Sequence, residues 1–100
     1  MGYRVIFTVR ADRDLEAAIA FLAQQSSIET AERIGREILA VTQALAQLPR
    51  RGGRVRRRPG LRKLTHRHYL LFYQINESAQ SVEIVRIWDG RQDPKTLRLP

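Results

Sequence analysis

The amino-acid sequence predicts an α+β fold of two layers, with a helical hairpin packed on a mainly antiparallel four-stranded sheet in the order β-α-α-β-β-β. Three observations support this prediction. An alternating strand pattern opens the chain, two helical patterns follow it, and three apolar strand patterns with short links fill the second half. A chain of 100 residues provides one small core, so we expect a single domain over residues 1–100.

The first strand is expected at residues 3–9, where apolar and polar side chains alternate. A helix follows it, and either Thr8 or Asp12 can cap the N-terminus of this helix. The sequence leaves both caps open. The apolar face of the helix has the i, i+3, i+4, i+7 spacing and consists of Leu15, Ala18, Ile19 and Leu22.

A break at residues 24–27 separates the first helix from a second one. Ser26 and Glu29 have the spacing of a capping box, Gly35 would let the two helices approach closely, and Pro49 is expected to end the second helix. Its apolar stripe consists of Ala31, Ile34, Ile38, Val41, Leu45 and Leu48. The opposite face is expected to carry the i, i+4 ion pairs Glu32–Arg36 and Arg33–Glu37.

The second half of the chain is expected to begin with a loop and to continue as a three-stranded meander. The loop, residues 50–60, contains six arginines, and glycine and proline interrupt it. The strands are expected at residues 61–65, 68–75 and 82–88, joined by a tight turn near His66 and Arg67 and a polar turn at residues 76–80. The middle strand is the most apolar and is therefore expected to be central.

The positive charge of the chain is unevenly distributed. The net charge is +8, yet residues 1–49 carry five basic and six acidic side chains, while residues 50–100 carry thirteen basic and four acidic ones. Such a balance favours an anionic partner. The absence of cysteine excludes disulfides, thiolate zinc sites and a cysteine nucleophile. No signal-peptide pattern and no membrane-spanning stretch are found, so we expect a cytoplasmic protein without a membrane partner.

Short motifs follow one another along nearly the whole chain. They are a Tyr-x-Val start at Tyr3, Ala11-x-x-Asp14-Leu15, Leu48-Pro49, Gly60-Leu61-Arg62-Lys63-Leu64, the strand Tyr69 to Ile75, and a closing run from Val85 to Pro94 that contains Trp88-Asp89-Gly90-Arg91. In this order and spacing the chain resembles the RelE/ParE toxins, which are often named plasmid stabilization proteins.

The resemblance implies an α+β toxin of a bacterial type II toxin–antitoxin system. Such a toxin inhibits growth and is neutralised by a cognate antitoxin, with which it forms a hetero-oligomer. RelE-like members cleave messenger RNA in the ribosomal A site. ParE-like members instead poison DNA gyrase and are not nucleases.

Cleavage of RNA at a 2′-hydroxyl requires a base, an acid and cations that face the phosphorane. The resemblance implies that Lys63 and Arg91 match two groups of the RelE pattern. Leu70 and Leu97 stand where that pattern has an arginine and a tyrosine, and leucine can neither stabilise a phosphorane nor transfer a proton. A nuclease would therefore depend on Lys63 and Arg91, with His66 or His68 as the remaining candidates for proton transfer.

The two histidines also have a simpler interpretation as solvated turn residues, and no acid or cysteine near them in the sequence completes a metal site. We expect neither a metal nor a cofactor. Tyr69 and Tyr73 share a strand face and are expected in the core. Trp88 is either a core aromatic or an interface contact.

A cationic surface is the expected binding site for the target, for nucleic acid or for the antitoxin. The alternative for the arginine-rich loop is a solvated segment without a specific partner. The candidate binding residues are Arg54, Arg56, Arg57, Arg58, Arg62, Lys63, Trp88 and Arg91.

The missing nuclease groups favour the ParE-like branch, so we expect an inhibitor of DNA gyrase that needs no catalytic residues of its own. A ribosome-dependent mRNA endonuclease and a degenerate, inactive member remain the alternatives.

Overall fold

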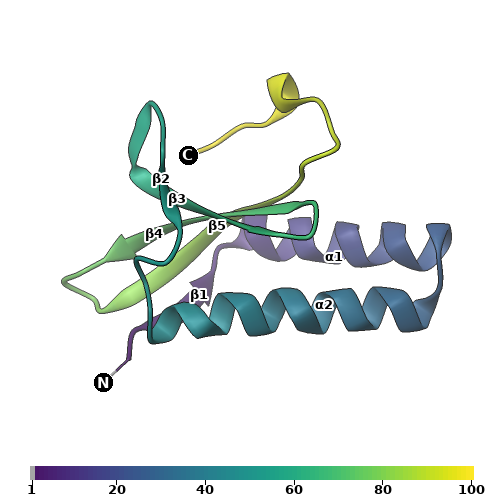
Figure 1. Cartoon of the computed structure of the whole chain (residues 1–100), viewed down its shortest axis with the longest axis horizontal. Coiled ribbons are helices and arrows are strands. Elements are labelled where there is room, and N and C mark those ends of the chain that lie inside the picture. The colour runs from purple at the N-terminus through teal and green to yellow at the C-terminus, as the bar shows by residue number, and fades with distance from the viewer. Residues whose placement is uncertain (1) are drawn as a thin grey trace.

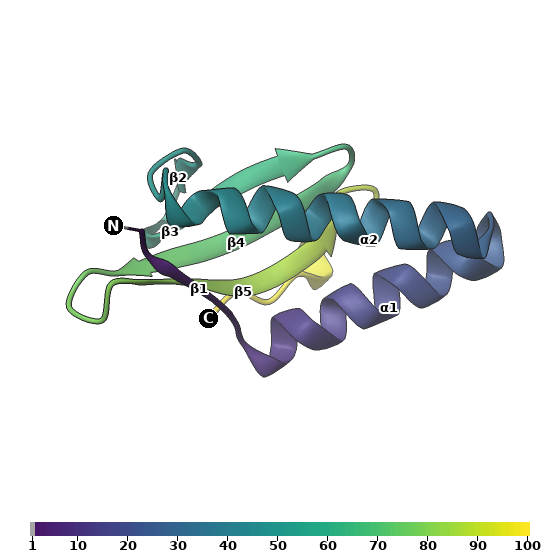
Figure 2. The same cartoon turned by 90° about the horizontal axis from the view of Figure 1, so that it is seen from below.

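Two antiparallel helices cover one face of a five-stranded sheet in the computed structural model, which describes residues 2–100 (Figure 1). Seen from the helix side, α1 and α2 lie in front of the strands (Figure 2). The helices are α1 (Val9–Gln25) and α2 (Ile28–Gln43), with short 3-10 turns η1 (Ala44–Ala46) and η2 (Pro94–Thr96). The strands are β1 (Arg4–Phe7), β2 (Gly53–Val55), β3 (Arg58–His66), β4 (Tyr69–Asn76) and β5 (Ser81–Asp89).

The two-layer α+β architecture is confirmed, but the prediction of four strands in the order β-α-α-β-β-β was wrong. The sheet has five strands in the spatial order β1-β5-β4-β3-β2. The additional strand β2 lies inside the segment 50–60 that was predicted to be a loop, and it pairs antiparallel with β3. Its single apolar residue, Val55, gives no alternating pattern. The helical hairpin carries the chain over the sheet, so β1 returns parallel to β5.

The first helix begins earlier than its apolar stripe indicates. Thr8 is the N-cap, and its Oγ1 accepts a hydrogen bond from the backbone N–H of Ala11 at 3.2 Å, which decides between Thr8 and Asp12. Val9, predicted as the last residue of the strand, instead opens α1 and is 67% exposed. The strand is therefore shorter than the predicted residues 3–9.

The capping box predicted at Ser26 and Glu29 was wrong by one residue. Ser27 caps α2, because its Oγ accepts a hydrogen bond from the backbone N–H of Thr30 at 3.0 Å. Ser26 ends α1 instead, with its N–H donating to the carbonyl of Leu22. The α-helical part of α2 also stops at Gln43, and η1 completes it, so it ends before Pro49.

The contacts of α2 follow the predicted stripe except at its ends. Gly35 allows close packing as expected, because a Cβ there would lie 3.0 Å from Ile19 Cδ1. The Glu32–Arg36 pair forms at 3.8 Å. The predicted Arg33–Glu37 pair is replaced by contacts of Glu37 with the β3–β4 turn. That turn is one residue later than predicted, because β3 includes His66.

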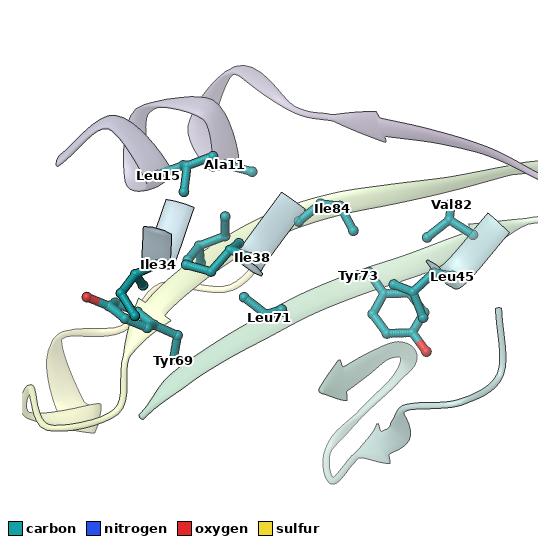
Figure 3. Close-up of a cluster of buried hydrophobic side chains, with 11 residues drawn as sticks. Ala11, Leu15, Ile34, Ile38, Leu45, Tyr69, Leu71, Tyr73, Val82 and Ile84 are labelled. Carbon is teal, nitrogen blue, oxygen red and sulfur yellow. The ribbon is translucent and has the colours of Figure 1, made fainter. Parts of the chain in front are cut away.

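The main core lies between the helices and the sheet (Figure 3). Tyr69 and Tyr73 are 1% and 0% exposed, which confirms their expected place in this core. The stripe of α2 contributes the buried residues Ile34 and Ile38, while Leu48 is 61% exposed because it follows the end of the helix. The other buried members are Ala11, Leu15, Leu45, Leu71, Val82, Ile84 and Ile87.

Candidate binding surface

A second, smaller apolar cluster lies on the sheet face that the helices leave free. Its buried residues are Leu61, Phe72, Val85 and Trp88. The C-terminal segment after β5, residues 90–100, which we name the tail, crosses this side of the sheet (Figure 1). Its residues Leu97 and Leu99 pack against the cluster. Trp88 is thus only 8% exposed, which agrees with its interpretation as a core aromatic.

Leu70 and Leu97 both pack against this cluster. They are the two positions at which the resemblance places an arginine and a tyrosine of the RelE pattern. The two residues are far apart in the sequence, and only the fold brings both of them to this cluster. The apolar character of this face is therefore a shared property of three strands and the tail.

Arg86 holds the C-terminal segment on the sheet. Its Nη1 donates to the carbonyl of Arg98 at 2.7 Å, and its Nε donates to Asp14 Oδ2 of α1 at 2.8 Å. The guanidinium lies over the ring of Trp88, 5.5 Å from its centroid, as in a cation–π contact. Asp14 also accepts from the backbone N–H of Ile87 at 2.9 Å. This arrangement joins the helix, the edge of β5 and the tail.

The bend of β5 explains how Arg86 reaches α1. Phe72 pairs with Arg86 and Tyr73 with Ile84, so Val85 is the additional residue of a β-bulge. The ion pair between Asp14 and Arg86 was not predicted from the sequence. The available signal was a lone arginine in an otherwise apolar segment of the last strand, together with an aspartate in the first turns of the preceding helix.

Lys63 is exposed and lies opposite Phe72, so the two side chains share the free face of the sheet. Within residues 2–100 its amino group has no hydrogen-bonding or ionic partner. Arg62 points to the opposite face, as expected for neighbours on a strand. Its Nη1 donates to the carbonyl of Gly52 at 2.7 Å, so Arg62 anchors the chain that leads into β2.

His66 lies away from Lys63. It shares a face with Tyr69 on the helix side, where its Nε2 is 2.8 Å from Glu37 Oε1. Arg67 donates to the same carboxylate through Nε at 2.7 Å. These hydrogen bonds, from Arg67 first and His66 second, lower the pKa of Glu37 to about 2. The interpretation of His66 as a solvated turn residue was therefore wrong.

The other candidates near the end of β5 are engaged with each other. Arg91 binds Asp89 through Nε at 3.1 Å and Nη2 at 2.8 Å. The hydrogen bond from Arg91 holds the pKa of Asp89 below its usual range. His68 Nε2 is 3.9 Å from Asp89 Oδ2 and makes no hydrogen bond to the described part of the chain. Lys63 thus lies on the free face and His66 on the helix face, whereas His68 and Arg91 both contact Asp89 where β5 ends.

Four of the predicted binding residues lie together on the hairpin of β2 and β3, residues 53–60, which we name the arginine hairpin. They are Arg54, Arg56, Arg57 and Arg58. All four are exposed, and none pairs with an acid anywhere in residues 2–100. The hairpin projects on the side of the sheet away from the helices (Figure 1).

A groove of about 860 Å³ runs between α1 and the end of β5. Phe21, which is 51% exposed, contributes apolar surface to it, and the cations Arg10 and Arg91 line it together with Asp14 and Asp89, the carboxylates with which they are paired. The groove therefore combines apolar contact area with ion pairs, as the surface for an amphipathic partner segment does.

No cluster of three or more possible metal ligands occurs in the described residues. Over the same residues, neither helix has the length and apolar character needed to cross a membrane.

Comparison with known structures gives the same fold. The chain is similar to a chain of the chromosomal ParDE toxin–antitoxin system from P. aeruginosa, with 24% identity, a TM-score of 0.75, and coverage of 85% of this chain and 92% of that one. It is also similar to a chain of the toxin–antitoxin complex RelBE2 from Mycobacterium tuberculosis, with 27% identity, a TM-score of 0.70, and coverage of 87% of this chain and 96% of that one. The isolated E. coli RelE toxin has the same fold, with 17% identity, a TM-score of 0.59, and coverage of 93% of this chain and 89% of that one.

A search of curated proteins by sequence gave no match. The family profile described as the ParE toxin of the type II toxin–antitoxin system parDE matches residues 5–94, which include both α-helices and all but the first residue of the sheet. With this match over most of its length, the chain belongs to the ParE family of type II toxin–antitoxin toxins.

Proposed function

We propose that this toxin inhibits growth by binding DNA gyrase and stalling the enzyme with its DNA cleaved, without a chemical step of its own. The observation that carries the proposal is the apolar character of the free sheet face. Leu70, Phe72 and Trp88 occupy it, and the tail covers them through Leu97.

An RNA-cleaving site would need a base, an acid and cations within reach of one phosphate. On the free face, Lys63 has apolar neighbours. His66 is on the opposite face with Glu37, and Arg91 is bound to Asp89. Because Lys63 and His66 lie on opposite faces and the charge of Arg91 is already paired, this arrangement supports inhibition by binding rather than by catalysis.

We propose an antitoxin as the partner of this chain because the chain belongs to the ParE family. Two of the similar structures are described as a toxin–antitoxin system and a toxin–antitoxin complex. The groove between α1 and β5 offers exposed apolar surface at Phe21, against which an amphipathic antitoxin segment would pack. We propose that the two proteins form a hetero-oligomer in the cytoplasm.

The test is a direct assay on gyrase. The purified chain is incubated with gyrase, ATP and supercoiled plasmid, and the reaction is stopped with detergent and protease. Linear DNA that depends on the toxin supports the proposal, and its loss on adding antitoxin provides the control. A parallel primer extension on translating ribosomes, with wild type and Lys63→Ala, detects A-site cleavage. Lys63-dependent cleavage without linear DNA overturns the proposal in favour of a nuclease, and the absence of both signals favours an inactive member.

A further inference from the structure

The arginine hairpin concentrates cationic charge that the protein itself leaves unused. No acidic residue occurs in the sequence between Glu37 and Glu77. Arg50, at the base of the hairpin, is paired with Glu77. Farther out, Arg54, Arg56, Arg57 and Arg58 have no such partner among residues 2–100. Their mutual repulsion opposes folding of the tip unless an external anion lies against it.

The hairpin is nevertheless firmly anchored. The hydroxyl of Tyr73 accepts from the backbone N–H of Gly52 at 2.9 Å and donates to the carbonyl of Pro49 at 2.7 Å. Arg62 binds the carbonyl of Gly52, and Val55 packs against the small apolar cluster. Figure 3 shows the Tyr73 hydroxyl pointing to this segment. The arginines are thus carried on an ordered two-stranded ribbon rather than on a loose loop.

The tip has a residue type that its backbone does not favour. Arg57 has φ 67°, in the left-handed region where glycine is the least strained residue. An arginine at this position costs stability relative to glycine, while it adds a charge at the outermost point of the ribbon. A side chain held against its backbone preference is a reason to seek a binding role.

We infer that the arginine hairpin binds the phosphate backbone of duplex DNA. Arginine guanidinium groups match phosphate oxygens in a two-pronged geometry. Apart from the arginines, the exposed residues of the hairpin are Pro59 and two glycines, and Val55 faces the cluster, so the hairpin offers no large apolar or aromatic anchor of the kind that protein interfaces use. It also has no aromatic residue on which single-stranded bases could stack.

The shape of the ribbon selects among duplexes. A two-stranded β-ribbon fits the major groove of B-form DNA, whereas the major groove of A-form RNA is too narrow for side chains to enter. Binding through phosphates alone is independent of base sequence. The inference concerns the chain itself and does not depend on gyrase being its target.

Fluorescence anisotropy of a short labelled DNA duplex, titrated with the full chain over a series of salt concentrations, tests the inference. The test variant combines Arg54→Gln, Arg56→Gln, Arg57→Gln and Arg58→Gln. The matched control removes the same charge elsewhere through Arg4→Gln, Arg13→Gln, Arg33→Gln and Arg36→Gln, all at exposed positions. Circular dichroism and thermal melting confirm that both variants are folded.

Each phosphate contact contributes about 0.9 to the slope of log K against log salt, so loss of four contacts lowers the slope by about 3.6. We expect this decrease for the hairpin variant, together with at least about tenfold weaker binding at low salt, and a slope change below about 1 for the control. Equal losses in both variants, or an unchanged slope in the hairpin variant, overturn the inference.

Competing anionic ligands separate the remaining possibilities. Duplex RNA, single-stranded DNA and polyglutamate are titrated under the same conditions. Equal or tighter binding to any of them overturns the choice of duplex DNA, and polyglutamate would then indicate an acidic protein partner. Trapping of cleaved DNA by gyrase is scored separately, so failure of the proposed function and failure of this inference give different results.

Discussion

The guanidinium of Arg86 lies 2.8 Å from the carboxylate of Asp14, a residue 72 positions earlier in the chain. The Arg86 side chain is 5% exposed and the Asp14 side chain 11%. The pair joins α1 to the bulged end of β5, and the same arginine fixes the tail over the apolar cluster. The cover of the free sheet face is therefore held both by Arg86 and by the packing of Leu97 and Leu99.

Removing either partner should strongly destabilise the fold, because the other charge is left buried without compensation. We expect Asp14→Ala and Arg86→Ala each to lower the free energy of unfolding by about 3–5 kcal/mol. Urea denaturation measures this change.

Arg10 provides the control for this pair. It contacts Asp14 at 3.3 Å, but its side chain is 63% exposed. Arg10→Ala should cost less than about 1 kcal/mol. If Arg86→Ala lowered the free energy of unfolding as little as Arg10→Ala does, the buried pair would contribute little to stability.

Local sequence patterns predicted the helices and the antiparallel meander because their apolar spacing is strong. The helical stripe identified Ile34 and Ile38, and alternation identified Tyr69 and Tyr73. Helix ends depend on single hydrogen bonds, so choosing Ser26 instead of Ser27 as the cap of α2 was an error that the two adjacent serines invite. These errors leave the layers of the fold unchanged.

Features that depend on a partner element could not be predicted from such patterns. The strand β2 has little apolar character and exists because β3 supplies its partner. The partner of Glu37 is likewise set by the β3–β4 turn, which brings His66 and Arg67 over α2. The predicted cationic surface proved to be divided, since Arg62 and Arg91 are bound within the protein while the arginine hairpin is free among the described residues.

The contact of Glu37 in α2 with His66 and Arg67 should make the stability of the fold depend on pH. The pKa of Glu37 is lowered from its usual value of 4.5 to about 2 by hydrogen bonds from Arg67 and His66. A depressed pKa contributes stability that is present above 4.5 and is lost as the pH falls toward 2. We expect Glu37→Gln to reduce this pH dependence, as measured by thermal melting across that range.

The matched control for Glu37 is Glu32, whose contact with Arg36 is exposed. Glu32→Gln should leave the acid-dependent part of the melting curve as in the wild type. An identical pH profile for the wild type and the Glu37→Gln variant would contradict the role assigned to this carboxylate.

Tyr73→Phe should loosen the base of the arginine hairpin without changing its charge. The substitution leaves the N–H of Gly52 and the carbonyl of Pro49 without their buried partner. We expect a loss of about 1–3 kcal/mol in unfolding free energy. Hydrogen exchange of the Gly52 amide should accelerate more than exchange in α2, and uniform acceleration would argue against a local anchor.

The fluorescence of Trp88 should show whether the tail lies on the sheet, because Trp88 is the single tryptophan of the chain. Leu97 packs on the cluster that holds Trp88. We expect Leu97→Asp to release the tail and to shift the Trp88 emission to longer wavelength, as water reaches the ring. Lys95→Asp, on the exposed part of the tail, serves as the control and should leave the emission unchanged.

Arg57→Gly should separate the stability of the arginine hairpin from its binding. Glycine relieves the left-handed backbone at φ 67°, so we expect the free energy of unfolding to rise by about 0.5–1 kcal/mol. The same change removes one charge from the tip and should weaken DNA binding and reduce the salt slope by about 0.9. Thermal melting and anisotropy on one preparation measure both effects. A variant that is more stable and binds DNA as tightly as the wild type would exclude Arg57 from the contact, because its charge would then have no part in binding.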